Sequence, residues 1–205
     1  MNRLVWSIVL ILLVSVQGCS YIGEYVEISK NESVSRQYLD VLNRWTREKT
    51  LYSQFETRAY ISTTKKSREF NKAYLSEYAR IYLVSDRERK TKEQLLVDQS
   101  SQYTEFMFYA YTPEKESNDF SNANSIWKIF LINKRGERLE PVDIRKITEV
   151  TPVIRELFPY VNPYYGSFYS IRFPREEGRS DGSDTCRLIF AGILGRAELV
   201  WGEGS

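Results

Sequence analysis

The chain begins with an apolar segment that determines which residues can belong to the folded protein. Arg3 is the only charged residue before residues 4–16, which read LVWSIVLILLVSV. A basic residue followed by a short apolar run is typical of a secretory signal peptide. The run is shorter than the roughly 17–25 residues of a membrane-spanning helix. We therefore expect residues 1–18 to be removed as a signal peptide, and the fold to lie in the rest of the chain.

A cysteine follows this segment directly. The stretch Val16-Gln17-Gly18-Cys19 resembles the lipobox of bacterial lipoprotein precursors, in which an aliphatic, a variable and a small residue precede the cysteine. The resemblance implies cleavage between Gly18 and Cys19, and lipid attachment to Cys19. Two or more acyl chains anchor a protein stably, because each buried methylene contributes about 0.8 kcal/mol. Ser20 after the cysteine resembles the enteric pattern for outer-membrane sorting, so the periplasmic face of the outer membrane is favoured over the inner membrane.

The resemblance divides the chain into three parts. After the signal peptide, residues 19–28 are expected to form the lipidated N-terminus and a short tether. Nine residues after Cys19 would span about 30 Å if fully extended, so the folded body should lie close to its membrane. Residues 29–205 are expected to form a single globular domain, since domains of up to about 250 residues are common.

Composition excludes several classes of function. Of the 29 basic residues only Arg3 lies in the signal peptide, so the mature chain contains 28 basic and 27 acidic side chains. This balance gives no reason to expect nucleic-acid binding, which needs a clustered basic face. The absence of histidine excludes Ser-His-Asp and Cys-His catalysis and histidine-ligated metals. We expect no catalytic residues, no metal ligands and no cofactor.

Cys186 is the second of the two cysteines. Two-residue alternation places Cys186, Leu188 and Phe190 on the same face of a predicted strand. We therefore favour a buried, small apolar side chain at this position over an accessible thiol.

Two regions have helical spacing. Ser29 and Glu32 have the spacing of a capping box, and the apolar residues that follow lie on one stripe: Val34, Tyr38, Val41, Leu42 and Trp45. This pattern predicts an N-terminal helix packed on the core. A second helical region is expected over about 68–100, with aromatic residues every fourth position: Phe70, Tyr74, Tyr78 and Tyr82. Within it, residues 86–93 contain no apolar side chain and form either a solvated stretch of helix or a break.

The rest of the chain is rich in strand patterns. Residues 51–63 alternate with a period of two. Further strands are predicted at 103–112, 126–132, 137–147 with a proline typical of an edge strand, 167–173, 186–192 and 196–201. About seven strands with short connections favour antiparallel pairing. We predict an α+β fold: an antiparallel β-sandwich, with an immunoglobulin-like arrangement as one form, an N-terminal helix and a long helical insertion after the first strand. A single sheet covered by helices is the competing arrangement.

An aromatic loop is the candidate binding surface. Residues 158–169 hold six aromatic side chains, two prolines and a glycine: Phe158, Tyr160, Tyr164, Tyr165, Phe168 and Tyr169 are the six rings. Rings on a stiff loop lose little entropy on contact, so they could bind a sugar ring or a protein partner. The competing interpretation, that the rings close one end of the sandwich, is favoured.

These features predict a non-enzymatic envelope lipoprotein that binds or scaffolds another envelope component and contacts the membrane through Cys19. One alternative is a module that binds glycan, peptidoglycan or a small ligand through residues 158–169. A hydrolase that uses carboxylates is the third possibility, and it would need a deep cleft with a shifted carboxyl pKa.

Overall fold

The computed structural model describes residues 34–175 and 185–202. The predicted signal peptide, the cleavage site at Gly18 and Cys19, the tether and the capping box of Ser29 and Glu32 lie outside these residues. Within them, every helix is too short or too polar to cross a membrane.

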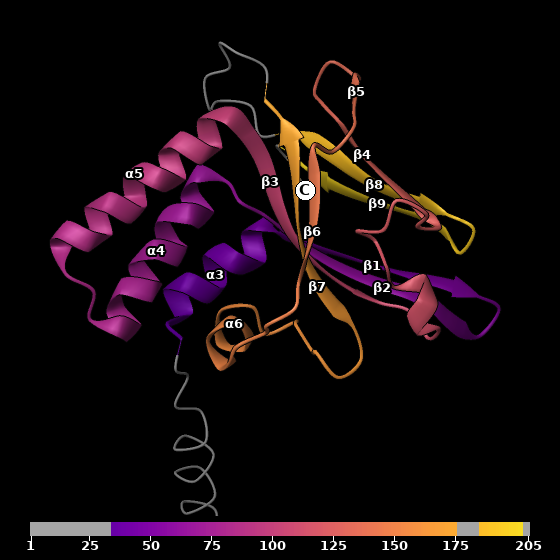
Figure 1. Cartoon of the computed structure of the whole chain (residues 1–205), viewed down its shortest axis with the longest axis horizontal. Helices are drawn as coiled ribbons and strands as arrows, with labels where there is room; N and C mark the ends of the chain where they lie inside the picture. The colour runs from indigo at the N-terminus through magenta and orange to yellow at the C-terminus, as the bar shows by residue number, and fades with distance from the viewer. Residues whose placement is uncertain (1–33, 176–184, 203–205) are drawn as a thin grey trace, which may run out of the picture. The chain divides into compact units, whose positions relative to one another are not determined.

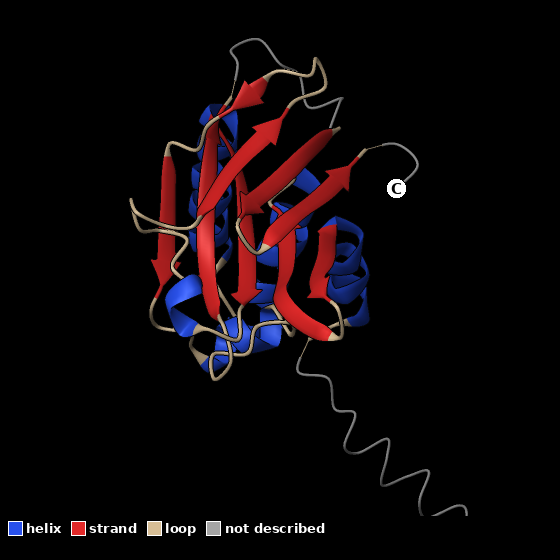
Figure 2. Cartoon of the chain, turned by 90° about the vertical axis from the view of Figure 1, so that its right-hand side faces the viewer, coloured by secondary structure: helices blue, strands red, loops and turns tan. Residues whose placement is uncertain are grey.

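Over the described ranges the fold is α+β, with two antiparallel sheets and four α-helices, which confirms the predicted class. The five-stranded sheet has the order β1 (Thr46–Ser53), β2 (Glu56–Lys65), β3 (Tyr103–Tyr111), β7 (Ser167–Pro174) and β6 (Asp143–Ile147). The four-stranded sheet has the order β5 (Arg138–Leu139), β4 (Trp127–Ile132), β8 (Cys186–Gly192) and β9 (Gly195–Trp201). The helices are α3 (Arg36–Trp45), α4 (Arg68–Tyr82), α5 (Asp86–Gln102) and α6 (Pro152–Leu157), with a 3₁₀ turn at Lys115–Ser117. Viewed from the four-stranded sheet, most of the helical residues lie behind the strands (Figure 2).

The two sheets share a hydrophobic core. Alternation along β3 turns Phe106 and Phe108 towards the four-stranded sheet, and both side chains are fully buried. The ring of Phe106 lies 5.1 Å from that of Trp201 on β9, and the ring of Phe108 lies 5.2 Å from that of Phe190 on β8. Aromatic contacts between strands of different sheets therefore join the two layers.

A second core lies between the five-stranded sheet and the helices. Phe168 on β7 contacts a cluster that includes Phe70 of α4 and Leu42 of α3. The hydroxyl of Tyr38 on α3 donates a hydrogen bond of 2.8 Å to the carbonyl of Leu157 on α6. Figure 1 shows α3, α4 and α5 on one side of the β3–β7 pair, and β4, β8 and β9 on the other. The five-stranded sheet is thus covered on both faces.

The N-terminal helix begins later than the sequence predicts. Its N-cap is Ser35, which has an extended backbone and whose side chain accepts a hydrogen bond from the Tyr38 amide. Ser35 is itself held by Glu77 of α4, which accepts hydrogen bonds of 2.7 Å from both its amide and its hydroxyl. The capping-box spacing at Ser29 did not reveal this start, because the partner that fixes it comes from a distant helix. The predicted burial of Tyr38 and Leu42 is confirmed.

The predicted helical region over 68–100 consists of two helices. Leu83 ends α4 in the left-handed conformation, and Ser85 caps α5 by accepting a hydrogen bond from the Glu88 amide. The polar residues 86–93 form the first half of α5, a helix without a single buried residue. They are therefore a solvated stretch of helix, and the break precedes them.

Two predicted strands are each divided in the structure, so the part of the chain that the structure describes contains nine strands instead of about seven. The alternation over 51–63 continues across a hairpin turn at Gln54, whose φ is +55°. The predicted strand 137–147 contributes β5 to one sheet and β6 to the other, with Pro141 between them. The short helix α6 was not predicted from the sequence, although Thr151 as its N-cap and Pro152 at its start are ordinary helix-start signals.

Candidate functional site

The structure separates the six rings of the predicted aromatic surface. Phe158, Phe168 and Tyr169 are buried, and Tyr160 is half-buried. Tyr164 and Tyr165 are 80% and 70% exposed. The predicted six-ring surface is therefore corrected to two rings, since the other four have neighbours within the protein.

Packing on both faces of the five-stranded sheet explains this correction. Phe168 faces the helices, where its ring lies 5.3 Å from that of Phe158. Tyr169 faces the other sheet, stacks on Phe108 at 4.8 Å, and donates a hydrogen bond of 2.6 Å to the carbonyl of Asn118. The hydroxyl of Tyr160 hydrogen-bonds Thr64 Oγ1 at 2.7 Å, and burial raises the pKa of this tyrosine.

The two exposed tyrosines lie on a braced turn. Asn162 Oδ1 accepts a hydrogen bond from the Tyr164 amide, and the Asn162 carbonyl accepts from the amides of Tyr165 and Gly166. Gly166 lies against β3 so closely that an added Cβ would come within 2.4 Å of the Ala110 carbonyl oxygen. These contacts fix the position of the loop and hold both phenol rings outward.

Other exposed apolar residues lie at the same end of the molecule, which we call the loop end. The register of the five-stranded sheet pairs Ala110 with Ser167, so the tyrosine loop, the end of β3 and the β1–β2 turn lie at one end. Leu194 of the β8–β9 turn shares a shallow pocket with Glu56 and Pro113. Half of the exposed large apolar side chains in the described part of the chain belong to this end: Tyr52, Phe55, Ile126, Tyr164, Tyr165 and Ile193.

Tyr52, Phe55 and Ile193 were not among the residues predicted to form a binding surface. The neighbouring residues could have identified two of them as turn residues. Phe55 lies in a polar stretch between two alternating runs, and Ile193 lies in a short segment bounded by two glycines. Large apolar residues inside turns are candidates for contact because a turn gives them no core to enter.

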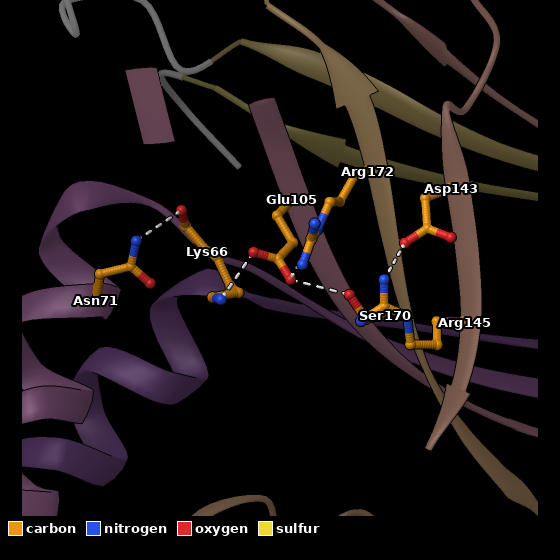
Figure 3. A network of polar contacts seen from close by, with 7 residues as sticks. All are labelled: Lys66, Asn71, Glu105, Asp143, Arg145, Ser170 and Arg172. Atoms are coloured by element: carbon orange, nitrogen blue, oxygen red, sulfur yellow. Dashed lines mark hydrogen bonds and ion pairs between the residues drawn. The ribbon is translucent and has the colours of Figure 1, made fainter. Parts of the chain in front are cut away.

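A network of charged and polar side chains lies on the helix-facing side of the five-stranded sheet (Figure 3). Glu105 on β3 is at its centre. Lys66 Nζ donates to Glu105 Oε2 at 2.8 Å, and Ser170 Oγ donates to Oε1 at 2.9 Å. Arg172 Nε is 3.7 Å from Oε1. The carboxylate therefore connects the segment after β2 with β3 and β7.

The electrostatics of this network favour a permanent charge. Burial opposes ionisation of Glu105, but the charge and hydrogen bond of Lys66, with smaller contributions from Ser170 and Arg172, hold its pKa below the ordinary value. Glu77 follows the same pattern: burial opposes ionisation, whereas hydrogen bonds from Arg80 and Ser35 lower its pKa. A general acid would need a raised carboxyl pKa, so both groups act as hydrogen-bond acceptors that join elements.

Cys186 is buried, as predicted. It lines a cavity of about 70 Å³ with Lys65, Leu131 and Asn133, at the end of the sheets opposite the loop end. Residues 34–175 and 185–202 contain no group of three or more metal-binding side chains.

Comparison with known proteins gave no match: no protein-family model, curated protein or solved structure is significantly similar to this chain.

Proposed function

We propose that this chain is a lipid-anchored protein of the bacterial cell envelope, with a non-enzymatic role in binding or scaffolding another envelope component. The apolar segment 4–16 and the following Cys19 support the anchor. The observation that carries the binding role is the pair of exposed rings, Tyr164 and Tyr165, on a loop braced by Asn162 and Gly166. Tyrosines held in this way supply contact area at little entropic cost.

We also propose that the two sheets form an immunoglobulin-like β-sandwich. The shared aromatic core supports this arrangement, and so do the crossings of the chain from one sheet to the other after β3, β5 and β7. Helices α4 and α5 follow β2 and precede β3, its neighbour in the same sheet. They are then an insertion between two adjacent strands, and the hairpin of β1 and β2 takes the place of the single first strand.

The anchor is tested by replacing Cys19 with serine. We expect the wild-type protein to be released from the outer-membrane fraction only by detergent, and Cys19→Ser to be found in the soluble fraction. In-cell crosslinking should then capture a specific envelope protein with the wild type and not with the unanchored variant. Equal membrane retention of both forms would contradict lipid attachment at Cys19.

The tyrosine pair favours a second candidate, in which the bound component is glycan or peptidoglycan. We expect Tyr164→Ala/Tyr165→Ala to change the free energy of unfolding by no more than about 0.5 kcal/mol, since both rings are exposed. The same double variant should no longer sediment with purified cell wall. Tyr160→Phe is the matched control: it should cost about 1 kcal/mol through loss of the hydrogen bond to Thr64 and leave sedimentation unchanged. Absence of sedimentation by the wild type would leave a protein partner as the ligand.

A further inference from the structure

Two hairpins end in apolar side chains that are almost completely exposed. Phe55, in the turn between β1 and β2, has an exposed fraction of 104%, and Ile193, in the turn between β8 and β9, has one of 87%. Neither side chain is part of either hydrophobic core. Neither one therefore stabilises the fold by its burial. With Tyr52, Ile126, Tyr164 and Tyr165 they form a group of exposed apolar side chains at the loop end, and a group of this kind marks a contact surface.

The two tips project from the same end. The β1–β2 and β8–β9 hairpins both end on the side of the molecule away from α4 and α5 (Figure 1). Leu51 of β1 lies next to Gly195 of β9, where an added Cβ would be 3.3 Å from Leu51 Cδ1. The tips can thus reach one flat surface together.

We propose that Phe55 and Ile193 insert into the interfacial region of a lipid bilayer and fix the orientation of the module on its membrane. A protein partner needs a surface complementary in shape to both prongs. A fluid bilayer has no such requirement, because lipids close around each inserted side chain. Side chains of this kind are buried about 5–10 Å into the boundary between headgroups and acyl chains.

The charges beside the tips indicate which lipids are needed. Glu56 and Arg58 follow Phe55 with opposite signs. Arg196, close to Ile193, is 2.9 Å from the carboxylate of Glu198. Glu114 lines the same pocket as Glu56 and Arg58, so these charged side chains form no cationic cluster beside the tips. Attachment therefore depends on the apolar side chains, and phosphatidylcholine without anionic lipid should be sufficient.

The position of the tyrosine pair agrees with this orientation. Tyr60 of β2 pairs with Tyr111, the last residue of β3. The first four residues of β2, 56–59, therefore extend past the end of β3 towards the β1–β2 turn. At about 3.3 Å per residue, the start of β2 at Glu56 lies some 13 Å past that level, and the turn with Phe55 lies beyond it. Tyr164 and Tyr165 lie in the turn just before β7, whose first residue, Ser167, pairs with Ala110 near the end of β3. Insertion of the tips therefore leaves both tyrosines near the headgroups and accessible to a partner.

The inference rests on the proposed function in one respect: an anchored module lies beside a bilayer. Fourteen residues lie between Cys19 and Val34, where the described structure begins, and full extension would separate these two positions by about 50 Å. Strand β2, with ten residues, is about 33 Å long. A tether longer than the strands permits the loop end to face the membrane.

The test uses the mature chain with Cys19→Ser, so that no acyl chain contributes to binding. Sedimentation with sucrose-loaded phosphatidylcholine vesicles should show saturable partitioning of this protein. Phe55→Ser/Ile193→Ser should reduce the partition coefficient at least about 10-fold, whereas Leu95→Ser/Val97→Ser should change it less than about 2-fold. The second pair is the matched control, since Leu95 and Val97 are exposed apolar residues on α5. Circular dichroism should show the same folded content in all three proteins.

Two results would overturn the proposal: equal loss of partitioning in both double variants, or no partitioning of the parent chain. Loss of a crosslinked protein partner in Phe55→Ser/Ile193→Ser without any vesicle binding would assign the tips to a protein interface instead. Mass spectrometry of Cys19 in the wild type reports lipid attachment separately. Failure of the anchor and failure of the tips are therefore distinguishable.

Discussion

Replacing Phe108 by alanine should lower the free energy of unfolding by about 3–5 kcal/mol. The side chain is fully buried at the centre of the core between the sheets. Its ring stacks on Tyr169 at 4.8 Å and meets Phe120 and Phe190 edge-on at 5.4 Å and 5.2 Å. Truncation removes all three contacts and leaves a cavity that strands from two sheets cannot close without losing their register. Urea unfolding monitored by tryptophan fluorescence measures the change.

Phe55→Ala provides a control with the same chemical change at a fully exposed site. It should alter the free energy of unfolding by less than about 0.5 kcal/mol, because Phe55 contributes to neither core. A small effect of Phe108→Ala, or equal effects of the two substitutions, would contradict the assignment of Phe108 as the residue that joins the two sheets. The comparison also separates the membrane role inferred for Phe55 from any role in folding.

Much of the strand content was predictable because burial on one face imposes a period of two. The runs that became β4 and β9 alternate clearly between buried and more exposed residues, since one face of each strand enters the core between the sheets. The runs that became β3 and β7 were recognisable instead by their aromatic residues, because both faces of these strands are covered. The same periodicity concealed two breaks. At Gln54 the alternation resumes after the turn with no gap, and near Pro141 the chain leaves one sheet for the other. Period alone does not record which strand a segment pairs with.

The candidate site was only partly predictable, for a related reason. Composition identified the aromatic stretch 158–169, and four of its six rings proved to be packing residues. Phe168 and Tyr169 are adjacent in sequence yet belong to different cores, because each face of β7 is covered by a different layer. Burial on both faces of a sheet can be predicted only when it is known that helices pack on its second face. Exposure of Tyr164 and Tyr165 likewise depends on Gly166, which brings the loop against β3.

The polar network around Glu105 had no sequence signal, because its members come from separate segments that meet only in the folded sheet. Lys66 follows β2, Glu105 is on β3, and Ser170 and Arg172 are on β7. Alternation along β7 places these last two residues on the same face as Phe168. One face of β7 thus carries an apolar residue that packs on the helices, and then a serine and an arginine that both contact Glu105.

Glu105→Gln should lower the free energy of unfolding by about 2–3 kcal/mol at pH 7. The carboxylate side chain is 12% exposed and its partner Lys66 is 18% exposed. Removing the negative charge leaves Lys66 and Arg172 together on the sheet without their shared counter-ion. Asp143→Asn is the matched control: Asp143 pairs with Arg145, which is 64% exposed, so solvent screening should limit the loss to less than about 1 kcal/mol.

The effect of Glu105→Gln should also depend on pH. The pKa of Glu105 is lower in the folded protein than its ordinary value of 4.5. Stabilisation by the carboxylate is therefore complete above the unfolded pKa and is lost as the pH falls through the lower, folded value. The difference between wild type and Glu105→Gln should be constant from pH 7 to about pH 5 and should shrink below about pH 4. Urea titrations across this range, together with the double variant Lys66→Met/Glu105→Gln, measure the coupling directly. A difference that grows on acidification would mean that the folded state favours the protonated carboxyl, and would reverse the role assigned to Lys66.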